Sequence, residues 1–218
     1  MRSDLDDETH TMTQQRLIIF TRYPEPGKTK TRLIPALGTL GAATLQQQMT
    51  EYVLSQAKAL QNIHPISIEV RFAGGEQQLM QNWLGENLQY VAQYTGDLGC
   101  RMETALVDAF QNKVKSAVII GSDCPQLKAE LIYQAFQLLH QDRNLVLGPA
   151  LDGGYYLIGL SRLIPELFTG IDWGTERVLQ QTINIAKQLK LNIAYLPTLA
   201  DVDRPEDLYI WQNIINKP

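Results

Sequence analysis

Short apolar runs alternate with longer amphipathic segments along most of this chain, and this alternation constrains its fold more than any other feature. The runs that predict strands cover residues 16–21, 66–72, 88–94, 117–120, 145–147, 155–160 and 193–196. Helical periodicity covers residues 40–60, 128–140, 163–168, 175–189 and 205–215, with further helices predicted around Leu79 and Met102. Strands that alternate with helices are typical of a mostly parallel sheet covered on both faces. The sequence therefore predicts an α/β fold of three α/β/α layers.

The size and composition of the chain agree with such a fold. It has 218 residues, of which 44% are hydrophobic and 19% charged, which is enough apolar content for a well-packed core. We find no internal repeat and no linker in residues 14–218, so we expect a single domain there. Residues 1–13 are polar and acidic, and we expect them to form a disordered tail.

Charge and cysteine content restrict the class of partner. The formal net charge of −4 argues against a large basic surface for nucleic acid. No apolar run approaches the roughly 20 residues of a membrane span, and the N-terminus lacks the apolar stretch of a secretory signal. Cys100 and Cys124 lie in unrelated motifs without the paired spacing of a zinc site. We therefore expect a cytoplasmic protein that does not bind nucleic acid and has no membrane span.

A single carboxylate follows the most apolar of the predicted strands. Residues 117–120 run directly into Gly121-Ser122-Asp123-Cys124-Pro125. Ligands of open α/β sheets bind at the carboxyl ends of the strands, so Asp123 is placed to hold a divalent cation or a polar substrate. Ser-Asp before Pro is also ordinary turn chemistry, and this alternative stays open for the motif taken alone.

A basic loop follows the first predicted strand. In the segment PEPGKTKTRL, residues 24–33, Gly27 is followed by Lys28, Lys30 and Arg32, with threonine hydroxyls between them. Backbone amides and cations on such a loop can cradle phosphate. The segment is not a P-loop, because the first glycine of that motif would fall at Arg22. We favour phosphate binding over a merely solvated basic loop.

Two further glycine-containing turns carry polar residues. In GDLGCRM, residues 96–102, Arg101 falls in the first turn of a predicted helix, where it can bind an anion or be simply exposed. In GPALDGGYY, residues 148–156, Gly153 and Gly154 allow close approach of a ligand and Asp152 can accept hydrogen bonds from hydroxyl groups. A hairpin turn built on Asp-Gly explains these glycines equally well.

An acidic segment precedes the last predicted helix. It reads DVDRPEDL over residues 201–208, and capping of that helix can account for Asp203. In an extended segment Asp201 and Asp203 point to opposite sides, so we expect one of them to share a cation with Asp123. Two carboxylates completed by phosphate oxygens are the expected ligands of a hard divalent cation.

These segments, in this order, resemble a family of bacterial GT-A-like proteins of the DUF2064 type, described as candidate glycosyltransferases and similar to nucleotide-diphospho-sugar transferases. The resemblance rests on PEPGKTKTRL, GDLGCRM, GSDCP, GPALDGGYYLIGL, DWG and DVDRPEDL, and it extends from about residue 16 to 215. It implies a Rossmann-like GT-A sheet. The Asp-x-Asp pair of many glycosyltransferases is absent, because Asp123 is flanked two residues away by Gly121 and Pro125.

The resemblance also implies roles for the candidate residues. It implies a Mg²⁺- or Mn²⁺-dependent transferase that takes a nucleotide donor and an acceptor of unknown identity, and we favour a nucleoside-diphosphate sugar as the donor. The residues expected to contact nucleotide or phosphate are Gly27, Lys28, Lys30, Arg32, Arg101, Gly153 and Gly154. Asp123 with Asp201 or Asp203 is expected to hold the metal, and Asp152 to orient the sugar or act as a base. A guanylyltransferase-like nucleotidyltransferase and a non-catalytic nucleotide-binding module are the alternatives.

Overall fold

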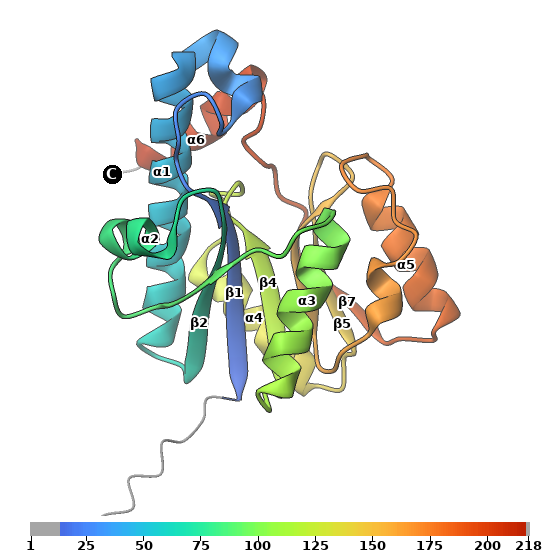
Figure 1. Ribbon diagram of the computed structural model, residues 1–218. Coiled ribbons are helices and arrows are strands. Elements are labelled where there is room, and N and C mark those ends of the chain that lie inside the picture. Colours follow the sequence, from blue (N-terminus) through green and yellow to red (C-terminus); the bar gives the residue numbers. More distant parts are fainter. Residues whose placement is uncertain (1–13, 217–218) are drawn as a thin grey trace, which may run out of the picture.

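The computed structural model describes residues 14–216, so the tail predicted for residues 1–13 lies outside the described residues. The described residues form one seven-stranded sheet with the order β3-β2-β1-β4-β6-β5-β7 (Figure 1). Strand β6 is antiparallel to both of its neighbours, and every other pair in the sheet is parallel. The strands are β1 (Gln15–Arg22), β2 (Ile66–Ala73), β3 (Gln89–Ala92), β4 (Ser116–Gly121), β5 (Leu145–Pro149), β6 (Tyr155–Leu160) and β7 (Ile193–Tyr195).

Helices cover both faces of this sheet, as predicted (Figure 1). One face packs against the first, second and fourth helices, through side chains such as Val53, Met80 and Phe136. The other face packs against the third and fifth helices, through Leu106 and Ala186. The helices are α1 (Ile34–Gln61), α2 (Gln77–Leu84), α3 (Leu98–Gln111), α4 (Ala129–His140), α5 (Val178–Gln188) and α6 (Leu208–Ile215). The three-layer α/β/α prediction is confirmed.

A third, smaller core fixes the segment before α6 above the carboxyl edge of the sheet. Leu33, immediately before α1, packs with Val202 and with Trp211 of α6, and Val202 is fully buried. Figure 1 shows α6 beside the first turns of α1. Because Val202 is anchored, the acids on either side of it are held near the ends of β1 and β4.

The structure differs from the prediction at several element boundaries. Helix α1 begins at Ile34 rather than at residue 40, with a kink at Gly38, whose φ of 70° and ψ of 171° are not helical. Residues 163–168 form only a short 3-10 turn, Pro165–Phe168, and α5 begins at Val178 rather than at 175. Gly38 explains the first error, because a glycine that interrupts a helical pattern reads as a boundary. Among the described residues, no helix is long and apolar enough to cross a membrane.

Candidate functional site

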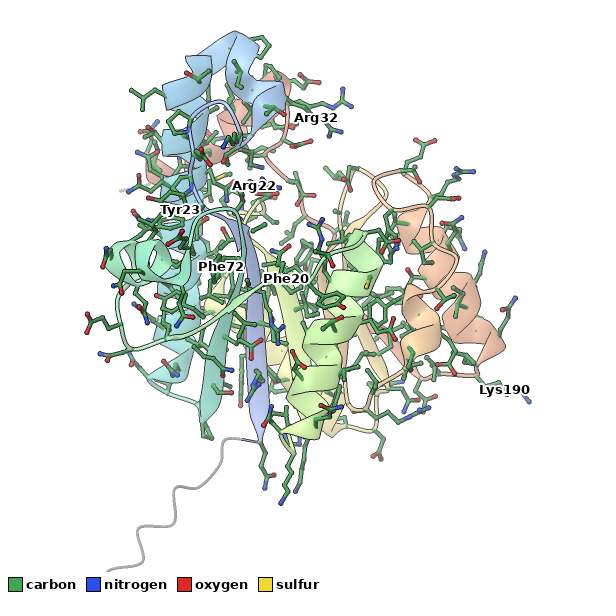
Figure 2. The ribbon with its side chains drawn as sticks, in the orientation of Figure 1. Phe20, Arg22, Tyr23, Arg32, Phe72 and Lys190 are labelled. Atoms are coloured by element: carbon green, nitrogen blue, oxygen red, sulfur yellow. The ribbon has the colours of Figure 1, made fainter. Side chains whose placement is uncertain are left out.

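A pocket with a volume of about 660 Å³ lies at the carboxyl ends of β1 and β4. Figure 2 shows Arg22 and Arg32 on this side of the molecule, with Lys190 on the remote side of α5. The predicted site residues that line the pocket are Lys28, Lys30, Arg32, Arg101, Asp123, Asp152, Gly154, Asp201 and Asp203. Gly27 and Gly153 are not in its lining. The structure thus brings together nearly all of the polar groups selected from separate parts of the sequence.

The three cations of the basic loop each pair with a different acid. Lys28 contacts Glu25 of its own loop at 2.7 Å and is largely exposed. Lys30 contacts Asp123 at 2.8 Å, and Arg32 pairs with Asp203. The loop therefore bridges to both acidic segments of the pocket in addition to presenting positive charge.

Lys30 is the most enclosed of these cations. Its side chain is 4% exposed, and its Nζ donates to the carbonyl oxygen of Val202 at 2.7 Å as well as contacting Asp123. Its backbone is left-handed, with a φ of 49°, immediately before the 3-10 turn Thr31–Leu33. A non-glycine residue in this region is uncommon, and here it directs the loop toward the carboxyl end of β4.

Internal hydrogen bonds hold the basic loop in shape. The buried hydroxyl of Thr29 donates to the carbonyl oxygen of Tyr23 at 3.0 Å and accepts from the amide of Glu25 at 3.2 Å. Gly27 adopts a φ of 82°, which a turn of this kind requires. The hydroxyl of Thr29 therefore stabilises the loop.

A buried polar network lies beneath Asp123 and was missed by the sequence reasoning. The side-chain amide of Gln46, on α1, donates to Ser122 at 3.0 Å, to Thr50 at 3.1 Å and to Thr21 at 3.2 Å. Thr21 and Thr50 also share a hydrogen bond of 2.8 Å. A glutamine within the buried stripe of α1 is the sequence signal that indicates such a network. This network holds Ser122, the residue directly before Asp123, in place.

Asp201 lies among like charges. Desolvation first, and then the negative charges of Asp123 and Asp152, raise the pKa of Asp201 to about 7, although Lys30 acts in the opposite direction. The carboxyl of Asp201 thus shares the pocket with two other acids. A cation placed between these groups would relieve this repulsion.

Asp203 has different surroundings, and it does not cap the last helix. Its carboxylate pairs with Arg32, while Asp207 accepts from the amides of Asp203 at 3.1 Å and of Arg204 at 2.8 Å. The alternative in which capping explains Asp203 is therefore wrong. Asp207 supplies the capping carboxylate because it follows the N-cap, Arg204, by three residues.

Asp152 lies in a hairpin turn that also borders the pocket. Residues 150–154 connect β5 to antiparallel β6, and the Asp152 carboxylate accepts from the amide of Gly154 at 2.8 Å. Gly153 has a φ of 88°, and a Cβ there would lie 2.2 Å from the carbonyl oxygen of Glu176. The hairpin interpretation of the glycines is confirmed. The turn also places an exposed carboxylate in the pocket, and contact of Asp152 with a ligand stays a prediction.

Arg101, on α3, and Trp173 also line the pocket. The Arg101 guanidinium donates to the carbonyl oxygen of Gly96 at 2.9 Å. Trp173 packs against the start of α3, where a Cβ on Gly99 would lie 2.4 Å from the indole nitrogen. Gly99 therefore permits an aromatic ring to line the pocket beside a cation.

Two other features of the structure, a buried thiol and a second cavity, do not offer a better candidate site. The Cys124 thiol is buried, and desolvation followed by the charge of Asp201 raises its pKa well above the ordinary range, so it is no thiolate nucleophile at neutral pH. A second cavity, of about 710 Å³, lies between Leu151 and α6, and its lining contains no Asp, Glu, Lys, Arg or His. The pocket at β1 and β4 is therefore the candidate site.

The acids of this pocket fit a divalent cation that shares its ligands with a substrate. Between residues 14 and 216, no three His, Cys, Asp or Glu side chains form a ready-made metal site. Asp123 and Asp201, however, lie in one pocket and repel each other across it. Hard cations such as Mg²⁺ commonly take one or two carboxylates and complete their coordination with water and substrate phosphates.

Comparisons with known proteins identify the family. The family profile described as "Uncharacterized protein conserved in bacteria (DUF2064)" matches residues 56–175. A crystal structure from Desulfovibrio desulfuricans G20, described as a candidate nucleotide-diphospho-sugar transferase, is 33% identical, with a TM-score of 0.87 over 94% of this chain and 89% of that one. Comparison with curated proteins gives no significant match.

More distant structures share the fold alone. A CMP:2-keto-3-deoxy-manno-octonic acid synthetase complexed with CTP is 9% identical, with a TM-score of 0.58 over 92% of this chain and 98% of that one. Glucosyl-3-phosphoglycerate synthase from Mycobacterium tuberculosis, in complex with Mn²⁺, UDP and glucosyl-3-phosphoglycerate, is 13% identical, with a TM-score of 0.56 over 92% of this chain and 77% of that one. The fold is thus that of nucleotide-using transferases, and the chain belongs to the DUF2064 family of nucleotide-diphospho-sugar transferase-like proteins.

Proposed function

We propose that this protein is a Mg²⁺- or Mn²⁺-dependent glycosyltransferase that moves a sugar from a nucleoside diphosphate to a small-molecule acceptor. The observation that carries this proposal is the convergence of the basic loop with Asp123, Asp152 and Asp201 in one pocket. Lysines and arginines beside carboxylates that repel each other suit a diphosphate bound together with a cation. The 33% identity to the Desulfovibrio protein supports the same reaction class.

In this proposal, the acids divide into two roles. Asp123 and Asp201 would hold the cation, which would supply charge stabilisation for the leaving diphosphate. Asp203 would act mainly by holding Arg32, with which it pairs. Asp152, which is exposed on a turn, would orient the sugar or accept a proton from the acceptor hydroxyl.

The cations would stabilise the charge that develops on the diphosphate as the sugar leaves. Lys28, Lys30 and Arg32 line the pocket from the basic loop, and Arg101 lines it from the first turn of α3. Gly27 and Gly153 would act by shaping the two turns, and Gly154 borders the space where the donor would bind. Fixed positive groups aimed at a leaving group are a major source of catalysis in such reactions.

The first experiment is a thermal-shift screen of nucleoside diphosphates and nucleotide sugars with and without Mn²⁺. A ligand that binds only the folded state raises the melting temperature. We expect a rise that requires Mn²⁺ and that is lost in Asp123→Ala. Tight binding of nucleotide and metal by Asp123→Ala would contradict the assignment.

A nucleotidyltransferase is the second candidate function. The KTKTRL loop resembles that of phospholactate guanylyltransferases, and the fold is shared with a synthetase solved in complex with CTP. Arg22 and Arg101 also line the pocket and add positive charge that would suit a triphosphate. The two reactions are separated by their products, because a nucleotidyltransferase releases pyrophosphate from a triphosphate and a glycosyltransferase releases a nucleoside diphosphate. Nucleotide binding without metal dependence or turnover would instead identify a non-catalytic binding module.

A further inference from the structure

Lys30 joins the three polar segments of the pocket through a single ammonium group. Its Nζ lies 2.8 Å from Oδ1 of Asp123 and 2.7 Å from the carbonyl oxygen of Val202. The ammonium therefore holds the basic loop, the carboxyl end of β4 and the segment between Asp201 and Asp203 together. With a side chain that is 4% exposed, it is enclosed by the groups that it joins.

The Lys30 ammonium contacts the same carboxylate, that of Asp123, that is proposed to bind the divalent cation. The side chain of Asp123 is 48% exposed and is the most accessible carboxylate of the proposed metal pair. A divalent ion on this carboxylate and the Lys30 ammonium would be two positive charges within a few ångströms of each other. Their repulsion is large where water is partly excluded, so both cannot bind Asp123 with full strength.

We infer that Lys30 is an internal cation that occupies Asp123 in the ligand-free protein and moves to the substrate diphosphate when a divalent cation binds. This inference rests on the proposed function and adds to it a coupling between the two ligands. The flexible four-carbon stem of lysine allows its ammonium to move without movement of the backbone. Phosphate oxygens would then replace the oxygens of Asp123 and Val202 as its partners.

The inferred exchange has a thermodynamic consequence. A divalent cation that binds alone must displace Lys30 and leave the ammonium without its carboxylate. A diphosphate that binds with the cation supplies a new partner for that ammonium. Cation and diphosphate should therefore bind with positive cooperativity, and the coupling must be equal in both directions.

The test compares Lys30→Met with the parent protein and with Lys28→Met. Lys28 lies on the same loop but pairs with Glu25 and is 68% exposed, so its removal controls for lost charge. With Mn²⁺ alone, measured by calorimetry, Lys30→Met should bind on the order of tenfold more tightly than the parent, and Lys28→Met, which removes a pocket charge that does not contact Asp123, should show a clearly smaller gain. With inorganic pyrophosphate at saturating Mn²⁺, Lys30→Met should bind on the order of tenfold more weakly.

A second measurement uses the unaltered protein and does not depend on the folding of a variant. Amine-reactive labelling with mass spectrometry should find Lys30 protected in the free protein, exposed by Mn²⁺ alone, and protected again when pyrophosphate is added. The labelling of Lys190, far from the pocket (Figure 2), should not change. Labelling of Lys30 that does not respond to bound Mn²⁺ would overturn the inference.

The outcomes separate this inference from the proposed function. Equal or weaker Mn²⁺ binding by Lys30→Met, in a parent that binds Mn²⁺ and pyrophosphate, overturns the inference and leaves the proposed function standing. Absence of Mn²⁺ binding in the parent and in Lys30→Met, with pyrophosphate present, overturns both. Tighter Mn²⁺ binding together with weaker pyrophosphate binding in Lys30→Met supports both.

Discussion

Two clusters of charged side chains lie on this sheet, and they differ in how their charges are balanced. The inner cluster consists of Arg16, Glu69, Arg71 and Asp108, packed between the sheet and α3. Glu69 is fully buried, contacts Arg16 at 2.9 Å and pairs with Arg71, which also contacts Asp108 at 2.7 Å. Two positive groups thus meet two negative groups, and each has an ion-pair partner.

The pocket cluster, formed by Asp123, Asp152, Asp201 and the cations beside them, is not balanced in this way. The pKa of Asp201 is raised to about 7 by desolvation and by the charges of Asp123 and Asp152. A partnered network of buried charges is a structural feature, whereas acids held against one another in an accessible pocket are typical of a site that binds a ligand. The comparison therefore favours a structural role for the inner cluster and agrees with the ligand-binding role proposed for the pocket cluster.

The largest expected effect is on the inner cluster. Glu69→Gln should destabilise the protein by about 3–5 kcal/mol, because it leaves Arg16 largely buried without a carboxylate and leaves Arg71 with Asp108 as its remaining carboxylate partner. Urea unfolding followed by circular dichroism measures this change. Asp152→Asn, an exposed pocket acid, serves as the control and should unfold at nearly the parent urea concentration. An unchanged unfolding midpoint for Glu69→Gln would contradict a structural role for the inner cluster.

The next effect concerns the pocket cluster. Asp123→Asn should weaken Mn²⁺-dependent nucleotide binding by about 100-fold or more, since it removes the charge of a proposed metal ligand. Its unfolding midpoint should fall, but by less than that of Glu69→Gln, because Lys30 loses its carboxylate yet keeps the carbonyl oxygen of Val202, and Asp123 itself is half-exposed. Isothermal calorimetry with Mn²⁺ and nucleotide measures the loss. Asp203→Asn is the matched control, with a smaller loss expected because Asp203 pairs with exposed Arg32.

A third prediction uses the pH dependence of stability. The pKa of Asp201 is about 7 in the folded protein, above its ordinary value, so the folded state binds an additional proton between about pH 4 and pH 7. Stability should therefore fall as pH rises through this window and become level above it. The expected loss is on the order of 1 kcal/mol, smaller than the full shift would give because Asp201 is only half-buried.

The variant Asp201→Asn isolates this contribution. Melting temperatures at pH 5 and pH 8 should differ less in Asp201→Asn than in the parent, and the variant should be the more stable protein at pH 8. Mn²⁺ with nucleotide should stabilise the parent at pH 8 but not this variant. An identical pH profile for the two proteins would show that the pKa of Asp201 is not raised in the folded protein.

The contrast between the clusters also shows what the sequence could and could not predict. The carboxyl ends of parallel strands share one edge of a sheet, so placing Asp123 after an apolar run was enough to predict its location. The pairing partners were not predictable, since Lys30 and Val202 are separated by 172 residues. The ion pairs of Glu69 and Arg71 were not predicted either. The sequence of residues 66–72 indicates a strand, but it does not show that Asp108 of α3 packs against that strand.

The smallest expected effect concerns the turn that supports the acidic segment. Asp207 accepts hydrogen bonds from the amides of Asp203 and Arg204, so Asp207→Ala should cost about 1 kcal/mol of stability. Loosening this turn should also weaken Mn²⁺-dependent nucleotide binding, by less than tenfold, because Val202 in the small core still holds Asp201 in place. Asp207→Asn keeps one acceptor oxygen and should lie between the parent and the alanine variant in both measurements. A loss of binding as large as that of Asp123→Asn would mean that the turn, and not the buried Val202, positions the acids of the pocket.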